Sequence, residues 1–244
     1  MSENGDAVIV TDLTVRFGGV VPIDRMTVSF AAGTCGLIGP NGAGKTTFFN
    51  VLSGFVRPVD GTVEAFGADL MAIPDFKRSR WGLRRTFQTE QAIASLSVYE
   101  NVLLVHEHTG GDRSSRRDDV MKAVAFVGLE RDARRLVGGL GAAQRRLVEV
   151  ARAVVGSPRL ILLDEPAAGL PEEETAHLGE LIRRIPEETG AVVILVDHDM
   201  SLVSACCTTT AVLDFGRLIA SGPTAGVLRE EQVVRAYLGT EEVA

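Results

Sequence analysis

The stretch GPNGAGKT, residues 39–46, constrains the fold more than any other part of the sequence. It matches the pattern G-x-x-x-x-G-K-[ST], which forms a loop between a buried strand and a helix. The continuously apolar CGLIG, residues 35–39, precedes it, and the helix-like KTTFFNVLSGF follows it. The sequence therefore predicts an α/β fold in which a buried strand leads into the amino terminus of a helix.

The backbone of this loop is suited to binding phosphate. Glycines at 42 and 44 let the chain wrap with its N–H groups pointing inward, beside a helix amino terminus that also favours negative charge. Lys45 would reach the β- and γ-phosphates of a nucleotide, and Thr46 would bind Mg²⁺. An incidental lysine in a glycine-rich turn is the alternative, but it leaves the flanking strand and helix unexplained. The residues expected to bind ATP here are Asn41, Gly42, Ala43, Gly44, Lys45, Thr46 and Thr47.

Two other apolar runs end in polar side chains. LILLD, residues 160–164, is followed by Glu165, and VVILVD, residues 192–197, is followed by His198. Such runs are typical of parallel strands buried on both faces, whose carboxyl ends form the ligand crevice of open α/β sheets. Asp164 would hold the magnesium ion, and Glu165 would orient or deprotonate a water for in-line attack. For either carboxylate alone, simple capping of a strand end is the alternative.

The rest of the chain divides by its hydrophobic patterns. Short β-rich segments within residues 7–31 and 61–66 predict an antiparallel sheet. The pattern is helical between about 89 and 155, with HTGGDRSSRR as an exposed loop, and AVLDFGRLIASG predicts a hairpin around Phe215 and Gly216.

Composition excludes several function classes. The net charge of −7 argues against nucleic-acid binding, which usually needs a basic face. The amino-terminal MSENGDAVIV lacks a charged segment followed by an apolar run, and the apolar runs are shorter than the roughly 18 residues of a membrane span. We therefore expect any membrane role to come through a partner. The three cysteines show no metal-ligand spacing and are expected to be reduced, buried thiols.

Taken in order, these motifs resemble the ATP-binding subunit of an ABC transporter, over essentially the whole chain. The resemblance implies a P-loop NTPase fold of the ABC type, with a RecA-like core, an antiparallel β subdomain and an inserted helical subdomain. It implies one ATPase domain over residues 1–244, with the core in 1–88 and 156–244 and the helical subdomain in 89–155. The ordered motifs are Phe17, the loop 39–47, Gln88 in RTFQ, the segment 140–144, Asp164 with Glu165, AAGL at 167–170, and His198 in LVDHDM.

The resemblance also implies roles that the residues alone do not establish. Phe17 would stack on adenine. Gln88 would touch the magnesium ion and the attacking water, and would relay contact with a membrane subunit. His198 would donate a hydrogen bond to the γ-phosphate. The alternatives are a core aromatic at Phe17, a surface amide at Gln88 and a structural histidine at His198.

The predicted helix in GLGAAQRRLVEVARAVVG, residues 139–156, begins without a Ser, Thr, Asp or Asn to cap it. In the family, this segment reads close to L-S-G-G-Q, and the helix amino terminus faces the γ-phosphate of ATP bound to the other subunit of a dimer. Here the serine hydroxyl is absent and two glycines have gained methyl groups, so a hydrogen bond to phosphate worth about 1.5–3 kcal/mol is lost. Pro171 is a second departure, where the family usually has Asp or Asn. The matching residues, called the signature below, are Leu140, Gly141, Ala142, Ala143 and Gln144.

These departures suggest an asymmetric pair of ATPase subunits. We expect the phosphate loop of this chain to work with an ordinary signature from a different partner, and the site that its own signature completes to be impaired. A heterodimer is favoured and a homodimer is the alternative, because backbone amides could be sufficient.

Several stretches are most similar to the ATPase subunits of branched-chain amino acid importers, among them GPNGAGKTTFFNVLSGF, RRTFQ, DEPAAGL and DHDMSLV. Such systems imply membrane-spanning permease subunits, a second ATPase subunit and, indirectly, a solute-binding protein, with this chain peripheral on the cytoplasmic face of the membrane. QTEQAIASLSVY, residues 88–99, would receive a short helix of the permease, with a solvated loop as the alternative. Other possibilities are urea or amide import, lipopolysaccharide export, a soluble ABC ATPase of translation or DNA repair, and a regulatory module with little hydrolysis.

Overall fold

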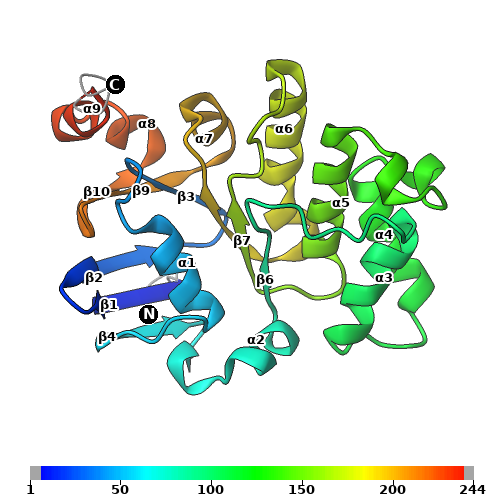
Figure 1. Ribbon diagram of the computed structural model, residues 1–244, viewed down its shortest axis with the longest axis horizontal. Coiled ribbons are helices and arrows are strands. Elements are labelled where there is room, and N and C mark those ends of the chain that lie inside the picture. Colours follow the sequence, from blue (N-terminus) through cyan, green and yellow to red (C-terminus); the bar gives the residue numbers. More distant parts are fainter. Residues whose placement is uncertain (1–6, 239–244) are drawn as a thin grey trace.

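The computed structural model describes residues 7–238, so the first six residues of MSENGDAVIV lie outside the described part. It contains two β-sheets with helices around them (Figure 1). The four-stranded sheet is antiparallel, in the order β2-β1-β4-β5, as the sequence predicts for residues 7–31 and 61–66. Its strands are β1 (Val8–Phe17), β2 (Val20–Phe30), β4 (Asp60–Ala65) and β5 (Ala68–Asp69).

The six-stranded sheet has the order β10-β9-β3-β8-β7-β6, and all of its neighbours are parallel except β9 and β10. The three continuously apolar runs form β3, β8 and β7, which are neighbours, so their carboxyl ends meet at one edge. Its strands are β3 (Thr34–Ile38), β6 (Leu83–Arg85), β7 (Leu160–Asp164), β8 (Val192–Val196), β9 (Thr209–Asp214) and β10 (Arg217–Pro223).

The predicted hairpin around Phe215 and Gly216 joins β9 to β10. Both turn residues have positive φ, 42° and 79°, which is the backbone of a type I′ turn and matches the right-handed twist of the strands.

Helices cover both sides of the parallel sheet. Figure 1 shows α1 beside the antiparallel sheet, and α3, α4 and α5 grouped at the other end of the molecule. The structure also contains a helix, α2, that the sequence pattern did not predict. The helices are α1 (Lys45–Ser53), α2 (Asp75–Trp81), α3 (Val98–His108), α4 (Arg116–Phe126), α5 (Ala142–Val154), α6 (Glu172–Thr189), α7 (Met200–Cys206), α8 (Thr224–Val227) and α9 (Glu231–Leu238), with 3₁₀ turns at Leu70–Ala72, Glu130–Asp132 and Val137–Gly139.

The predicted loop HTGGDRSSRR is shorter than the sequence suggests. His108 ends α3 and Arg116 begins α4, so only residues 109–115 connect the two helices. The residues at its two ends, His108 and Arg116, are polar because they occupy exposed positions on helices. A surface helix carries such residues on its solvent face.

The core lies on both faces of the parallel sheet. Successive residues of β7 alternate between two hydrophobic clusters: Ile161 and Leu163 pack in one with the helices α3 to α6, while Leu160 and Leu162 pack in the other with the antiparallel sheet and α1. This double burial holds the carboxyl edge of the sheet in a fixed position. Among residues 7–238, no helix is both long and apolar enough to cross a membrane. The subdomain boundaries at 88/89 and 155/156 stay predictions.

Candidate functional site

The phosphate loop joins β3 to α1 and folds back on β2. Gly42 and Gly44 have φ of 81° and 108°, which side-chain-bearing residues rarely adopt. A Cβ at Gly44 would lie 2.3 Å from the carbonyl oxygen of Pro22, so the loop also approaches β2 too closely for any side chain there. The sequence pattern therefore holds the loop in one wrapped shape. Asn41, Gly42 and Thr46 are exposed, Thr47 is half-buried, and Ala43, Gly44 and Lys45 are buried.

Lys45 lies at the centre of this loop. Its Nζ donates hydrogen bonds to the carbonyl oxygens of Gly39 and Pro40, at 2.5 and 2.9 Å. Burial lowers the pKa of Lys45, and the nearby carboxylates of Glu165 and Asp164 oppose that shift. The structure thus brings the loop lysine and the two predicted carboxylates into one electrostatic site.

Asp164 ends β7 and is held from the neighbouring strand β6. Its Oδ2 accepts a hydrogen bond from Arg85 Nη2 at 3.0 Å, and its backbone N–H donates to Thr86 Oγ1 at 3.1 Å. Burial raises the pKa of Asp164, and the hydrogen bond from Arg85 opposes that rise. Sequence reasoning missed Arg85 and Thr86, although both lie in the RRTFQ stretch that it quoted.

Glu165 follows in a strained backbone conformation. Its φ is 47°, unusual for a residue with a side chain, and its N–H donates to Val196 O at 2.8 Å. Gln88 Nε2 donates to Glu165 Oε2 at 2.9 Å, so these two predicted site residues are in contact. Arg146 of α5 in turn donates to the carbonyl oxygen of Gln88, at 3.3 to 3.4 Å. Gln88 is therefore held by its side-chain amide to Glu165 and by its backbone carbonyl to α5.

His198 stands beside a buried carboxylate at the end of β8. Its side chain is 69% exposed, whereas that of Asp197 is 1% exposed. Asp197 Oδ1 accepts hydrogen bonds from the backbone N–H groups of His198 and Asp199, at 2.8 and 3.0 Å. Its other oxygen lies 3.5 Å from the N–H of Ala167. Asp197 thus fixes the backbone, and the imidazole of His198, whose Nδ1 lies 3.6 Å from Asp197 Oδ1, stays largely exposed to a ligand.

Phe17 lies at the end of β1 and is 52% exposed. This exposure excludes the alternative of a core aromatic.

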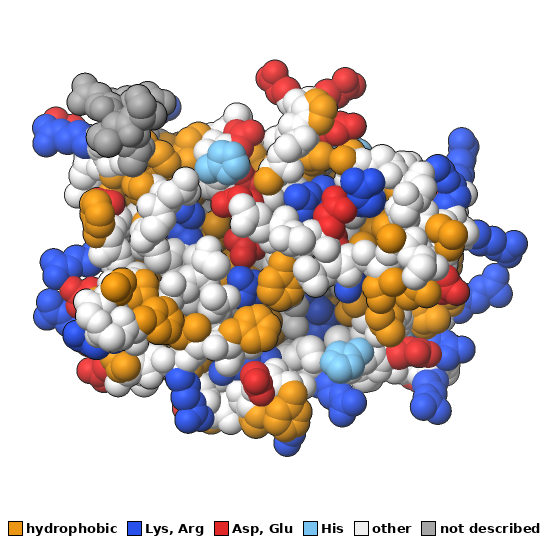
Figure 2. All heavy atoms as spheres, in the orientation of Figure 1, with side chains coloured by type: hydrophobic (Ala, Val, Ile, Leu, Met, Phe, Trp, Pro, Cys, Tyr) orange, Lys and Arg blue, Asp and Glu red, His pale blue; other side chains and the backbone are white. Residues whose placement is uncertain are grey.

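Acidic and basic side chains gather near the middle of the face seen in Figure 2, which has the same orientation as Figure 1.

The signature lies apart from the phosphate loop of the same chain. In Figure 1, α5 packs with α3 and α4, whereas α1 lies beside the antiparallel sheet. Leu140 is buried, Gly141 and Ala142 are exposed, and Ala143 and Gln144 are half-buried. Gly141 is the residue before the helix and has no side chain to cap it, but Gln144 Oε1 accepts a hydrogen bond from the Gly141 N–H at 3.3 Å. The helix therefore begins at the surface with half of a capping box.

The oxygen donors around Lys45 fit Mg²⁺. Thr46 offers a hydroxyl in the first turn of α1, and Asp164 offers Oδ1, because Arg85 occupies Oδ2. Within residues 7–238, no group of three or more His, Cys, Asp or Glu side chains could enclose a metal. Magnesium at nucleotide sites is typically held by one or two side chains plus the phosphates, so this sparse set is the expected one.

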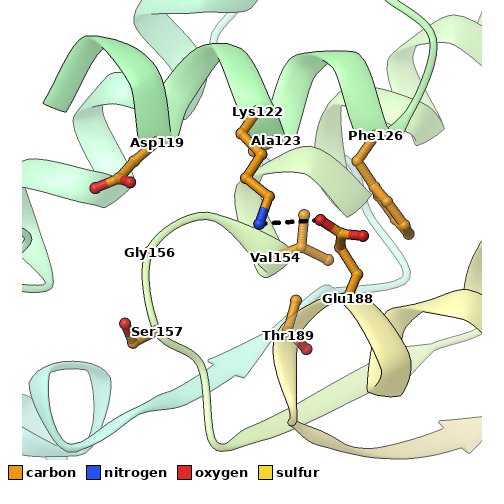
Figure 3. A pocket seen from close by; sticks show the side chains of 9 residues that line it. All are labelled: Asp119, Lys122, Ala123, Phe126, Val154, Gly156, Ser157, Glu188 and Thr189. Carbon is orange, nitrogen blue, oxygen red and sulfur yellow. Dashed lines mark ion pairs between the residues drawn. The ribbon is translucent and has the colours of Figure 1, made fainter. Parts of the chain in front are cut away.

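A separate pocket of about 140 Å³ contains none of these residues. Figure 3 shows it between α4, the turn after α5 and the end of α6, where Lys122 Nζ forms an ion pair with Glu188 Oε1 at 3.0 Å. Its lining consists of side chains that pack between helices and one exposed ion pair. We therefore interpret it as a gap between packed helices and not as a reactive site.

Comparisons with known proteins agree on one family. A family model described as "ABC transporter" matches residues 23–168. The high-affinity branched-chain amino acid transport ATP-binding protein BraF of Pseudomonas aeruginosa is 35% identical, covering 94% of this chain and 96% of its own. The corresponding LivG protein of Escherichia coli is 34% identical with the same coverage.

Solved structures agree with the sequence relatives. A nucleotide-free ATP-binding cassette from an ABC transporter matches with a TM-score of 0.84 and 25% identity, covering 96% of this chain and 99% of its own. The ADP conformation of such a cassette matches with a TM-score of 0.85 at the same identity and coverage. These likenesses confirm the predicted resemblance and fold class over nearly the whole chain.

Proposed function

This chain belongs to the ABC transporter family, and on that premise we propose how its site divides the work of ATP hydrolysis. The chain is the ATP-binding subunit of an ABC transporter, and its reaction is the hydrolysis of ATP. The observation that carries the residue roles is the contact of Gln88 with Glu165, 2.9 Å, next to the buried Asp164 and Lys45. The cationic Lys45 and the acidic Asp164 and Glu165 thus lie at the same phosphate-binding loop.

Phosphate charge is stabilised first. Backbone N–H groups of the loop and of the start of α1 face the phosphates, apart from that of Ala43, which donates to Pro40 O at 3.2 Å. Lys45 neutralises charge on the β- and γ-phosphates. Phe17 stacks its exposed ring on adenine. Thr46, Asp164 and Gln88 would hold Mg²⁺, which supplies charge stabilisation on the phosphates when bound.

Water then attacks the γ-phosphorus in line, and the bond to the bridging oxygen breaks, giving ADP and phosphate. Glu165 orients the water and accepts its proton, while Gln88 holds both the water and the carboxylate. His198 donates a hydrogen bond to the γ-phosphate from its exposed imidazole. These roles rest on the geometry given above together with the family resemblance.

A pair of glutamine substitutions tests the role of Glu165. We expect Glu165→Gln to abolish turnover while ATP binding is retained, because the amide cannot accept the proton. Glu180→Gln, on the exposed face of α6, is the matched control and should retain whatever turnover the wild type has with its partner subunits. Full turnover in Glu165→Gln would contradict the assigned role.

The cargo that we propose is branched-chain or related amino acids, imported from outside the cell. Support comes from the two relatives named above, which are branched-chain amino acid transport proteins by name. Uptake of labelled leucine, measured in cells that carry the full transporter with wild type or Glu165→Gln, tests this proposal. Leucine uptake that is the same with both would contradict it, and uptake of urea or an amide instead would favour the alternative cargo.

The partners that we propose are permease subunits, with a solute-binding protein acting through them, and the chain on the cytoplasmic face of the membrane. The contact surface is residues 88–99, where Ile93 is 40% exposed and Ser97 caps α3. Next to this segment lies a cavity of about 310 Å³ whose lining includes Phe55, Phe76 and Phe87. Exposed aromatic rings beside a nucleotide-sensing glutamine suit an apolar segment of a membrane subunit.

We propose that the second ATPase subunit is a different chain. The Gly141-Ala142-Ala143 start of α5 keeps backbone donors but lacks the hydroxyl for the partner's ATP, and Pro171, which precedes α6, offers no side-chain cap. Restoring Ser-Gly-Gly at 141–143 should raise the ATPase activity of the complex with its partner. Unchanged activity would remove the basis for an impaired second site.

A further inference from the structure

We propose that Arg85 is a positioning residue that fixes the orientation of the Asp164 carboxylate and thereby the affinity of the site for a divalent cation. This inference rests on the proposed function, since it concerns the carboxylate assigned to Mg²⁺. Arg85 ends β6, and its side chain is only 5% exposed, against 8% for Asp164. Nη2 binds one oxygen of the carboxylate, Oδ2, at 3.0 Å. The other oxygen, Oδ1, takes no part in this ion pair, and the carboxylate interacts electrostatically with Lys45.

The other end of the guanidinium is tied to the helix of the phosphate loop. Nη1 donates to Asn50 Oδ1 at 2.8 Å and to Ser53 Oγ at 3.2 Å, both on α1. One planar group therefore connects the last residue of β7 with the helix that begins at Lys45. Because the fork of donors is rigid, rotation of the Asp164 carboxylate requires breaking at least one of these hydrogen bonds.

Aromatic rings hold the guanidinium in place. Its Cζ lies 4.8 Å from the ring centre of Phe87 and 5.5 Å from that of Phe49, distances typical of cation–π contacts. Phe87 also lines the cavity of about 310 Å³ beside residues 88–99. Arg85 is thus packed between a pocket open to a partner and the carboxylate at the catalytic edge.

Two neighbouring buried arginines donate hydrogen bonds to backbone carbonyls instead of side chains. This difference distinguishes a positioning role for Arg85 from a role in packing alone. Arg84, on the same strand, donates to the backbone carbonyls of Ser79 and Leu83. Burial lowers its pKa to about 10. Arg78 donates to the carbonyls of Val51 and Leu52. Arg85 instead donates to three side chains, one of them the assigned metal ligand, so its bonds control side-chain orientation rather than backbone.

The test measures metal binding without turnover. The full chain is titrated with Mn²⁺ in the presence of the non-hydrolysable nucleotide AMP-PNP, and free Mn²⁺ is followed by electron paramagnetic resonance. Arg85→Lys keeps the charge but loses the fork, and Arg85→Met loses both. We expect both to weaken Mn²⁺ binding by about tenfold, as is common when the partner of a metal ligand is removed. AMP-PNP binding in excess EDTA should stay at the wild-type level.

Arg84→Lys and Arg84→Met are the matched controls, because they alter a buried arginine on the same strand that does not touch Asp164. They should bind Mn²⁺ as the wild type does even if they lower the unfolding temperature. If the Arg85 variants do not fold, Phe87→Ala loosens the guanidinium without removing it and should weaken Mn²⁺ binding, whereas Phe76→Ala, on the same cavity, should not.

The outcomes separate this inference from the proposed function. Mn²⁺ binding by Arg85→Met that equals or exceeds that of the wild type would overturn the positioning role, because it is the result expected if only the positive charge mattered. Wild-type Mn²⁺ binding by Arg85→Lys would overturn it as well, because the lysine lacks the fork of donors. Absence of Mn²⁺ binding in the wild type with AMP-PNP would contradict the proposed function instead.

Discussion

Gly141→Ser should stabilise the protein, because the site for an N-cap is already built. Gly141 has φ of −68° and ψ of 165°, which a serine adopts readily at an N-cap, and a Cβ there would meet nothing within 4 Å. Gln144 Oε1 already accepts from the Gly141 N–H. A serine hydroxyl would accept the N–H of Gln144 in return and complete the capping box.

The size of the effect follows from two contributions. Serine is better than glycine as an N-cap by a few tenths of a kcal/mol. Replacing glycine at a compatible backbone position adds about 0.4–1 kcal/mol, because the unfolded chain loses freedom. The sum is about 0.5–1.5 kcal/mol, which corresponds to an increase in melting temperature of about 1–6 °C for a chain of this size.

Urea unfolding followed by circular dichroism measures this change, and Gly128→Ser is the matched control. A Cβ at Gly128 also meets nothing within 4 Å, but its φ is 75°, so serine should be neutral or destabilising there. If Gly141→Ser fails to raise the free energy of unfolding above that of the wild type, the reading of the α5 terminus as an uncapped helix start is wrong.

Three further predictions concern the loop, the core and the carboxylate of Asp119. Lys45→Met should weaken binding of a fluorescent ATP analogue by at least about tenfold, because a charge-assisted contact to phosphate contributes about 1.5–3 kcal/mol; binding at the wild-type level would contradict its placement in the site. Phe48→Ala should lower the free energy of unfolding by about 3–5 kcal/mol in urea, since this ring is fully buried; a loss under about 1 kcal/mol would refute it. Hydrogen bonds from Ser115 and His106 hold the pKa of Asp119 below 3.8, so its ionised form stabilises the fold above that pH and the effect is lost as pH falls. Asp119→Asn should therefore cost more stability at about pH 7 than at about pH 3, and equal costs would contradict the assignment.

The buried strands and their shared edge could be predicted because the signal is local. Each of β3, β7 and β8 is a short run of mostly apolar residues, and such a run is typical of a strand covered on both faces. The strand β6 lies beside β7 at the edge of the same sheet but reads Leu-Arg-Arg, so it gave no apolar signal. Its two arginines are buried, and the terminal nitrogens of their guanidinium groups donate hydrogen bonds to backbone and side-chain oxygens.

The role of Arg85 could not be read from the sequence for the same reason. Its partners Asn50 and Asp164 lie 35 and 79 positions away, and nothing in the local pattern pairs them. Likewise the sequence singled out Gln88, but not the hydrogen bond from Arg146, 58 positions away, that holds its backbone. The spacing of the motifs was sufficient to predict the residues of the phosphate loop and of the strand ends. Contacts between residues far apart in the sequence could be identified only in the folded structure.

The most direct test of the account is ATP hydrolysis by the purified chain alone, compared with Glu165→Gln, together with size-exclusion chromatography in ATP and magnesium. We predict tight ATP binding with little turnover and no ATP-dependent dimer, because the chain has a complete phosphate loop but a signature without its serine. Turnover that Glu165→Gln abolishes, accompanied by an ATP-dependent dimer of the chain with itself, would contradict the asymmetric partnership, since it would mean that Gly141-Ala142-Ala143 completes a working site.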